Sequence, residues 1–234
     1  MVLPLYLAMT GAEMSSVSAF SFPLAYMACQ FSPWGPGLTN IPDAFPERAM
    51  LILTDRMDCR GHSADLVARQ LQDAVTQLKC ESVLLDFQRP PDPESTVMAE
   101  AIIRSLPCPV AVTEAFAAGL SCPVFLSPAP LHLPLAEYLS LWTGREVWLE
   151  AALCQEEIII TGSGSECIQQ FPPEGLEDGF YDEKLCCHYR IKPDVAQITF
   201  TLFDTPDSLE KKLELAQSLG VTRAVGLWQE LGAK

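Results

Sequence analysis

Basic residues are scarce in this sequence and are missing altogether from its first 47 positions. The 234 residues include 15 Lys and Arg against 30 Asp and Glu, which gives a formal net charge of −15. A protein that binds nucleic acid needs a basic surface to neutralise phosphates, so this composition argues against that class of partner. The same negative charge argues against binding to an anionic membrane surface.

The sequence also lacks the patterns of a secretory signal and of a membrane span. No Lys or Arg precedes Arg48, so the positive region of a signal peptide is missing. No apolar run reaches the roughly 18 residues that a spanning helix requires. We therefore expect a cytoplasmic protein with no membrane-spanning segment.

Cysteines are numerous but lack the spacing of a metal or redox site. The count is nine, which is odd, and there is no C-x-x-C pair. The run Cys186, Cys187 and His188 cannot chelate one ion from a strand, because adjacent side chains point to opposite faces. We expect reduced, structural cysteines and neither a metal nor a cofactor.

Short, almost continuously apolar runs recur along the chain, as in strands that are covered on both faces. Hydrophobic residues make up 49% of the sequence, which is enough for a substantial core. The predicted strands are Leu3–Met9, Leu24–Phe31, Met50–Thr54, Val83–Phe87, Val110–Thr113, Val124–Leu126, Glu146–Ala151 and Ala224–Trp228.

Helical patterns separate several of these runs. The segment 63–79 has Ser63 as a plausible N-cap, and 208–220 stops at Gly220. Alternating strands and helices indicate α/β with a parallel sheet. Eight strands predict a (β/α)₈ TIM barrel, close to its usual size of about 250 residues.

Two segments interrupt this alternation. Residues 31–47 contain four prolines and two glycines, which predicts a long loop after the second strand. Residues 156–203 hold three strand-like runs joined by turns, and "TGSGSE" (Thr161–Glu166) is typical of a hairpin turn rather than a phosphate loop. We expect a single domain, 1–234, with a small antiparallel insertion lobe at 156–203, before the last strand.

Polar residues follow several predicted strands, at the face where barrel enzymes carry their chemistry. Carboxylates around the flat ring of Trp228 suit a sugar, whose CH faces stack and whose hydroxyls bond to acids. Each of these polar residues could instead be a helix cap or a solvated side chain. The candidate residues are Asp55, Asp86, Gln88, Glu114, Glu150, Glu230 and Trp228.

At "ESVLLDFQ" the chain resembles glycoside hydrolase family 18, the chitinases and their relatives. That family carries D-x-x-D-x-D-x-E at the end of its fourth strand, and the aligned residues here are Glu81, Leu84, Asp86 and Gln88. The C-terminal segment resembles the family's closing signature, in the style of its short bacterial spore and cell-wall members. Its matching positions are Asp204, Ser208, Lys212, Gly220, Gly226 and Trp228.

The resemblance implies a mechanism that this sequence departs from. In the family, the motif Glu protonates the leaving oxygen, and the substrate's acetamido group, oriented by the neighbouring Asp, attacks the anomeric carbon. Here Asp86 is retained, but Gln88 stands at the acid position, and an amide has no proton to give near neutral pH. Ser127 and Pro128 stand where the family's Met-x-Tyr-Asp is expected.

Three functional hypotheses remain from the sequence. The favoured one is a degenerate site that binds carbohydrate, such as a glycan that contains N-acetylglucosamine, or that has another non-catalytic role. The second is an active glycosidase in which Glu114 or Glu150 replaces the missing acid. The third is a scaffold protein whose barrel mouth is unused. The sequence does not specify the oligomeric state.

Overall fold

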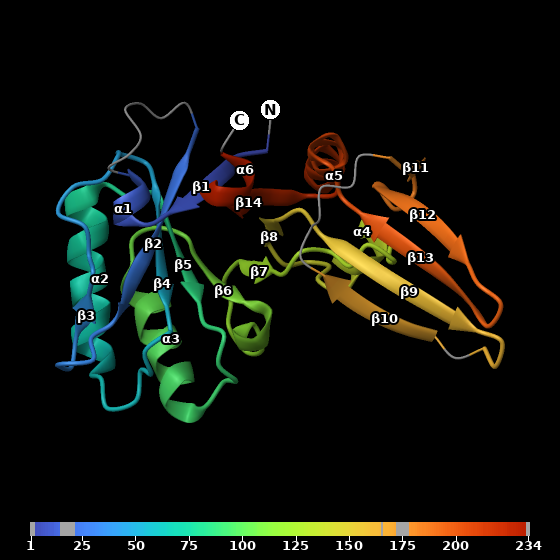
Figure 1. Cartoon of the computed structure of the whole chain (residues 1–234). Helices are drawn as coiled ribbons and strands as arrows, with labels where there is room; N and C mark the ends of the chain where they lie inside the picture. The colour runs from blue at the N-terminus through green and yellow to red at the C-terminus, as the bar shows by residue number, and fades with distance from the viewer. Residues whose placement is uncertain (1–2, 15–21, 165, 172–177, 233–234) are drawn as a thin grey trace. The chain divides into compact units, whose positions relative to one another are not determined.

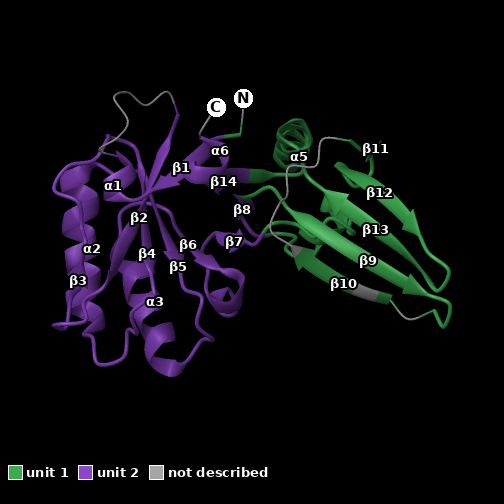
Figure 2. Ribbon diagram, in the orientation of Figure 1, with its two compact units in different colours: residues 1–3, 128–144, 151–221 green, residues 4–127, 145–150, 222–234 purple. Residues whose placement is uncertain are grey.

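The computed structural model describes residues 3–14, 22–164, 166–171 and 178–232. The chain divides into two compact units (Figure 2). One, the barrel unit, comprises residues 4–127, 145–150 and 222–234; the other, the lobe unit, comprises 1–3, 128–144 and 151–221. Whether the chain as a whole behaves as one domain stays a prediction.

The predicted TIM barrel is confirmed. Eight parallel strands follow one another around a closed sheet, and the pairing of Leu7 with Leu24 and of Ala8 with Ala25 joins the first two strands and closes it (Figure 1). Every predicted barrel strand is present. In chain order they are β1 (Leu5–Met9), β2 (Leu24–Phe31), β4 (Met50–Thr54), β5 (Ser82–Asp86), β6 (Val110–Thr113), β7 (Val124–Leu126), β8 (Val147–Ala151) and β14 (Val221–Leu227).

The helices that follow barrel strands in the sequence differ greatly in length. The long ones begin at side-chain caps: Ser63 accepts from the Leu66 amide, and Asp92 forms a capping box with Ser95. The elements are α1 (Gly11–Met14), α2 (Ala64–Leu78), α3 (Pro93–Ser105), η1 (Glu114–Phe116), α4 (Leu135–Ser140), α5 (Pro206–Ser218) and α6 (Trp228–Leu231).

The loop predicted at 31–47 contains a short strand, β3 (Leu38–Thr39), which forms an antiparallel pair with the end of β2. Two bonds anchor this region to α2 and to its preceding loop. The side-chain oxygen of Gln70 accepts from the Leu38 amide at 2.8 Å, and His62 Nε2 lies 3.1 Å from the Ser32 carbonyl oxygen.

Side chains alternate between the inside and the outside of the barrel. The interior core includes Tyr6 and Ala8 of β1, Leu84 of β5, and Trp148 of β8, together with residues of the other strands. Val83 and Leu85, one place away from Leu84, are also buried, but outside this cluster. Because the side-chain period of a strand is two, the alternation decides which residues at each strand end point along the barrel axis.

The lobe unit contains the predicted antiparallel sheet. Its strand order is β10-β9-β13-β12-β11, and Thr161 and Glu166 lie at the two ends of the β9–β10 hairpin, as predicted; Ser165 lies outside the described residues. Leu131 and Leu202 pack together in its core. The strands are β9 (Gln155–Thr161), β10 (Glu166–Phe171), β11 (Phe180–Asp182), β12 (Cys187–Pro193) and β13 (Gln197–Phe203).

The closing signature forms a buried ion pair within the lobe unit. Lys212 Nζ on α5 lies 2.7 and 2.9 Å from the two carboxylate oxygens of Asp204, which follows β13. The Ser208 hydroxyl donates to the same carboxylate at 3.2 Å, and the Cys154 amide donates at 3.3 Å. These residues therefore attach the start of α5 to the end of the sheet.

This network predicts a specific pattern of stabilities. Lys212→Met alone should lower the free energy of unfolding by about 3 kcal/mol, because it leaves the buried Asp204 charge without its cation. The double variant Asp204→Leu with Lys212→Met should recover part of that loss. Urea unfolding followed by circular dichroism measures both. An unchanged midpoint for Lys212→Met would contradict the argument.

Candidate functional site

Asp86 and Gln88 stand at the C-terminal end of the fourth barrel strand. Asp86 is the last residue of β5, two positions after the interior residue Leu84, so its side chain continues the inward-facing row. The side-chain amide nitrogen of Gln88, Nε2, donates a hydrogen bond to Asp86 Oδ1. Burial raises the pKa of Asp86 and the nearby charge of Asp55 adds to the increase, while the bond from Gln88 opposes it.

Asp55 supports the backbone at this position. Its carboxylate is buried and accepts hydrogen bonds from the backbone amides of Gln88, at 2.8 Å, and Arg89, at 2.9 Å. The side chain of Arg89 also donates a hydrogen bond from Nε to the backbone carbonyl oxygen of Asp55, at 3.0 Å. Asp55 thus fixes the chain that carries Gln88, while both of its carboxylate oxygens are already engaged with backbone amides.

Glu150 lies at the equivalent position on the seventh barrel strand, β8. It follows the interior residue Trp148 by two, so it also faces the barrel axis. Burial raises the pKa of Glu150 to about 7, with further increases from the negative charges of Asp86 and of the exposed Glu230. The structure therefore brings Asp86, Glu150 and Glu230 into one electrostatic cluster at the barrel mouth.

Glu114 is placed differently from the other predicted acids. It is exposed and is the first residue of η1, directly after β6. Within the described part of the chain its carboxylate makes no hydrogen bond or ion pair, and it does not contribute to the pKa shifts of Asp86 or Glu150. Of the two replacement acids considered from the sequence, Glu150 is the one that the structure associates with Asp86.

Trp228 packs against a cluster outside the barrel interior. Its ring stacks on Phe22, with centroids 5.2 Å apart, and covers buried Met9 and Leu24. Leu227, one residue earlier, packs against the interior core instead. The strand β14 ends at Leu227 and a helical turn begins at Trp228, so its role as the floor of a sugar site stays a prediction without a contact that supports it.

An exposed indole that the sequence prediction missed lies in the loop after β2. Trp34 is 93% exposed, although its backbone is held by a bond from its amide to the Ser32 hydroxyl at 3.2 Å. The Ser32 amide in turn donates to the Gly37 carbonyl at 2.8 Å. The signal in the sequence is that Trp34 follows Pro33 and precedes Gly35, Pro36 and Gly37. These residues favour a turn, and a side chain at the end of such a turn has few neighbours that could bury it.

The strand geometry around the Cys-Cys-His run agrees with the expectation of opposite faces. Cys187 is buried against Leu131 and Leu202, whereas His188 stacks on Phe203 at 5.6 Å. Within the described residues, no group of three or more His, Cys, Asp or Glu side chains is arranged to hold a metal ion. None of the helices in the same part of the chain is long and apolar enough to cross a membrane.

Solved structures share the fold of this chain, a TIM barrel with an additional antiparallel sheet. No family model and no curated protein matches the chain. The spore cortex-lytic enzyme SleL of Bacillus cereus is similar, with a TM-score of 0.56 and 12% identity over 100% of this chain and 72% of that one. The spore cortex-lytic enzyme SleL of Bacillus megaterium QM B1551 is also similar, with a TM-score of 0.54 and 10% identity over 99% of this chain and 71% of that one.

A chitinase from Chromobacterium violaceum ATCC 12472 is similar as well. Its TM-score is 0.51 at 10% identity, over 96% of this chain and 93% of that one. At these identities the similarity establishes the fold alone. Both kinds of neighbour share the barrel whose mouth, in this chain, carries Asp86, Gln88 and Glu150.

The raised pKa of Glu150 predicts a pH-dependent effect of Glu150→Gln. Its folded-state pKa, about 7, lies above the ordinary value of 4.5, so the charged form is disfavoured in the folded protein. The stability contributed by the neutral form is complete below pH 4.5 and is lost as the pH rises through 7. At pH 8, Glu150→Gln should therefore raise the free energy of unfolding by up to about 3 kcal/mol.

Urea unfolding of the wild type and Glu150→Gln at several pH values measures this effect. The increase in the free energy of unfolding caused by Glu150→Gln should shrink toward zero as the pH falls below about 5. Glu114→Gln, which changes an exposed carboxylate at the same end of the barrel, is the matched control and should have little effect. A gain that is equal at all pH values would show that Glu150 is not the titrating group.

Proposed function

We propose that this chain is a family 18-like glycan-binding protein in which the catalytic acid has been replaced by an amide. The observation that carries the proposal is the hydrogen bond from the Gln88 amide to Asp86 at the end of the fourth barrel strand. Gln88 has the shape of a protonated Glu and can donate hydrogen bonds, but it cannot transfer a proton to a leaving group. Loss of a positioned general acid costs roughly 10²–10⁴ in rate.

The ligand class follows from the groups that remain at the mouth. Asp86 is an acceptor for a sugar amide or hydroxyl, and Gln88 keeps its carbonyl oxygen and a second N–H for further bonds. Trp34 offers an exposed flat face beside the end of β2, where a pyranose ring can stack. The similar structures are a chitinase and spore cortex-lytic enzymes, which supports glycans that contain N-acetylglucosamine.

A second candidate function is favoured by one specific observation, the pKa of Glu150. A carboxyl group with a pKa of about 7 is protonated in a large fraction of molecules near neutral pH, as a general acid must be. Burial raises the pKa of Asp86 as well, but the hydrogen bond from Gln88 lowers it and so favours the charged form of Asp86. Under this alternative the chain is a glycosidase with its acid displaced from the fourth strand to the seventh.

Binding to chitooligosaccharides tests the main proposal. Isothermal titration calorimetry should give saturable binding to the wild type, and Asp86→Ala should weaken it at least about tenfold through loss of a charged acceptor. Trp34→Ala should also weaken binding without affecting the fold, because the indole is exposed. Glu114→Gln is the matched control.

Trp228→Ala is not a suitable test, because that ring packs on Met9 and Leu24 and its removal would destabilise the barrel. Absence of saturation by millimolar chitooligosaccharides would contradict glycan binding. It would leave the scaffold hypothesis as the better description.

Gln88→Glu separates the two candidate functions. If only the acid is missing, this variant should hydrolyse a fluorogenic N-acetylglucosamine glycoside that the wild type leaves intact, with a gain of about 10²-fold or more over background. If the wild type already hydrolyses the glycoside and Glu150→Gln abolishes the activity, the displaced-acid mechanism is supported instead. No turnover by Gln88→Glu would show that more than the acid has been lost.

A further inference from the structure

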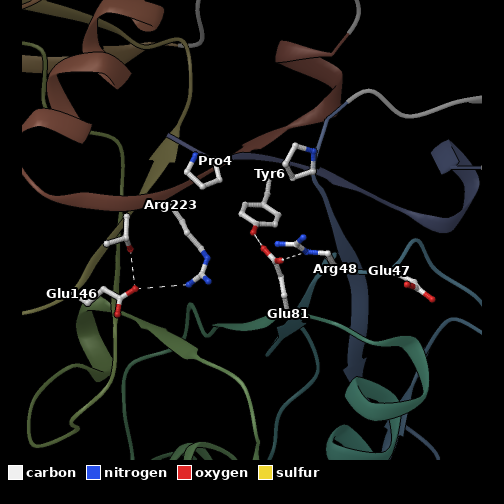
Figure 3. Close-up of a pocket in the computed structure, with 9 residues that line it drawn as sticks. Pro4, Tyr6, Glu47, Arg48, Glu81, Glu146 and Arg223 are labelled. Carbon is white, nitrogen blue, oxygen red and sulfur yellow. Dashed lines mark hydrogen bonds and ion pairs between the residues drawn. The ribbon is translucent and has the colours of Figure 1, made fainter. Parts of the chain in front are cut away.

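A pocket of about 430 Å³ opens at the end of the barrel opposite the candidate glycan site (Figure 3). Its lining comes from the starts of strands: Pro4 before β1, Tyr6 within β1, Pro23 before β2, and Glu81 before β5. Residues at this face of a TIM barrel normally contribute to stability alone. The volume, however, lies within the range of about 300–1,000 Å³ that is typical of ligand pockets.

Arg223 in the wall of this pocket has unused hydrogen-bonding capacity. Its guanidinium stacks over the Trp148 ring, 4.6 Å from the centroid. Its Nη1 forms an ion pair with Glu146 Oε1 at 3.8 Å, a distance too long for a hydrogen bond (Figure 3). The side chain is only 19% exposed, yet within the described residues it makes no hydrogen bond. A guanidinium has five N–H donors, so the ion pair with Glu146 leaves Arg223 donors that a ligand carboxylate can engage.

The carboxylates around the pocket are already balanced by other donors. Glu81 accepts from the Tyr6 hydroxyl and from Arg48 Nε, and the dashed lines in Figure 3 mark both bonds. Glu47 forms an ion pair with Lys79. These acids therefore do not occupy Arg223, even though the chain as a whole is strongly negative.

Glu146, the nearest acid to Arg223, is engaged in the same way. Its Oε1 accepts from Trp148 Nε1 at 3.0 Å and from the Thr222 hydroxyl at 2.9 Å. These bonds hold the carboxylate against the wall of the pocket and fix the Trp148 ring on which Arg223 stacks. The guanidinium is thus pre-organised, with its planar edge available to a ligand.

We propose that this pocket binds a small hydroxylated carboxylate, of the sugar-acid class. The ligand carboxylate pairs with the guanidinium of Arg223, whose fork geometry suits two parallel hydrogen bonds. The ligand hydroxyls donate to the remaining lone pairs of Glu81 and Glu146, since each carboxylate oxygen accepts more than one bond. The rings of Pro4 and Pro23 provide apolar contact for its CH groups.

The site is independent of the proposed glycan site. Its residues lie at or just before the starts of barrel strands, whereas Asp86 and Gln88 lie at and just after the end of one. Its proposed ligand is a small anion that pairs with Arg223, whereas the proposed ligand of the mouth is a glycan. Either proposal can therefore fail without the other.

Titration with D-glucuronate, followed by tryptophan fluorescence and calorimetry, tests this inference. Binding should saturate, and the emission should change because Arg223 stacks on Trp148. D-glucose lacks the carboxylate and acetate lacks the hydroxyls, so each should bind at least about tenfold more weakly. Equal affinity for glucose, or no saturation by millimolar glucuronate, would overturn the proposal.

Two variants locate the site. Arg223→Lys keeps the charge beside Glu146 but loses the planar fork, and should weaken glucuronate binding about tenfold. Thr222→Tyr places a large ring at an exposed position in the pocket wall and should block binding without depending on the fold of the Arg223 variant.

Two further variants are the controls. Arg60→Lys changes an exposed arginine paired with Asp58, and Asp86→Ala changes the barrel mouth; both should bind glucuronate as the wild type does. Wild-type affinity in both Arg223→Lys and Thr222→Tyr, or loss of affinity in Asp86→Ala, would place the ligand elsewhere and contradict the assignment.

Discussion

The closed parallel ladder is the constraint on which the rest of this structure depends. Once β1 pairs with β2 and the sheet closes, each strand has an inside and an outside, and a shift of one residue would exchange them. The interior positions of Leu84 and Trp148 determine that Asp86 and Glu150 meet at one end of the axis. At the opposite end, the hydroxyl of the interior residue Tyr6 donates a hydrogen bond to Glu81, which precedes β5.

Much of this arrangement could be predicted from the sequence, because it depends on local patterns. Continuous apolar runs identified the strands, and the caps at Ser63 and the stop at Gly220 identified helix ends, with Gly220 adopting a φ of +95° that favours glycine. Trp228 shows the limit of such reasoning. The sequence predicts that Trp228 ends the last strand, but a helical turn begins there, and the ring stacks on Phe22.

The interactions that the sequence could not reveal are those between residues far apart in the chain. Glu114 and Glu150 were equivalent candidates from the sequence, since both follow predicted strands. Only the folded chain distinguishes them, because burial and the charge of Asp86 act on Glu150, whereas Glu114 is exposed. Arg223 gave no signal at all, because its stacking on Trp148 and the open pocket arise from strands 75 residues apart.

The amide of Gln88 has an electrostatic consequence as well as a chemical one. A carboxylate at that position would add a negative charge beside Asp86, whose pKa is already raised by burial and by Asp55, and near Glu150, whose pKa is about 7. Each further charge in such a cluster makes ionisation of the others more costly. The neutral Gln88 instead donates a hydrogen bond that favours the charged form of Asp86. A neutral amide at position 88 therefore helps to keep Asp86 a charged hydrogen-bond acceptor at the barrel mouth.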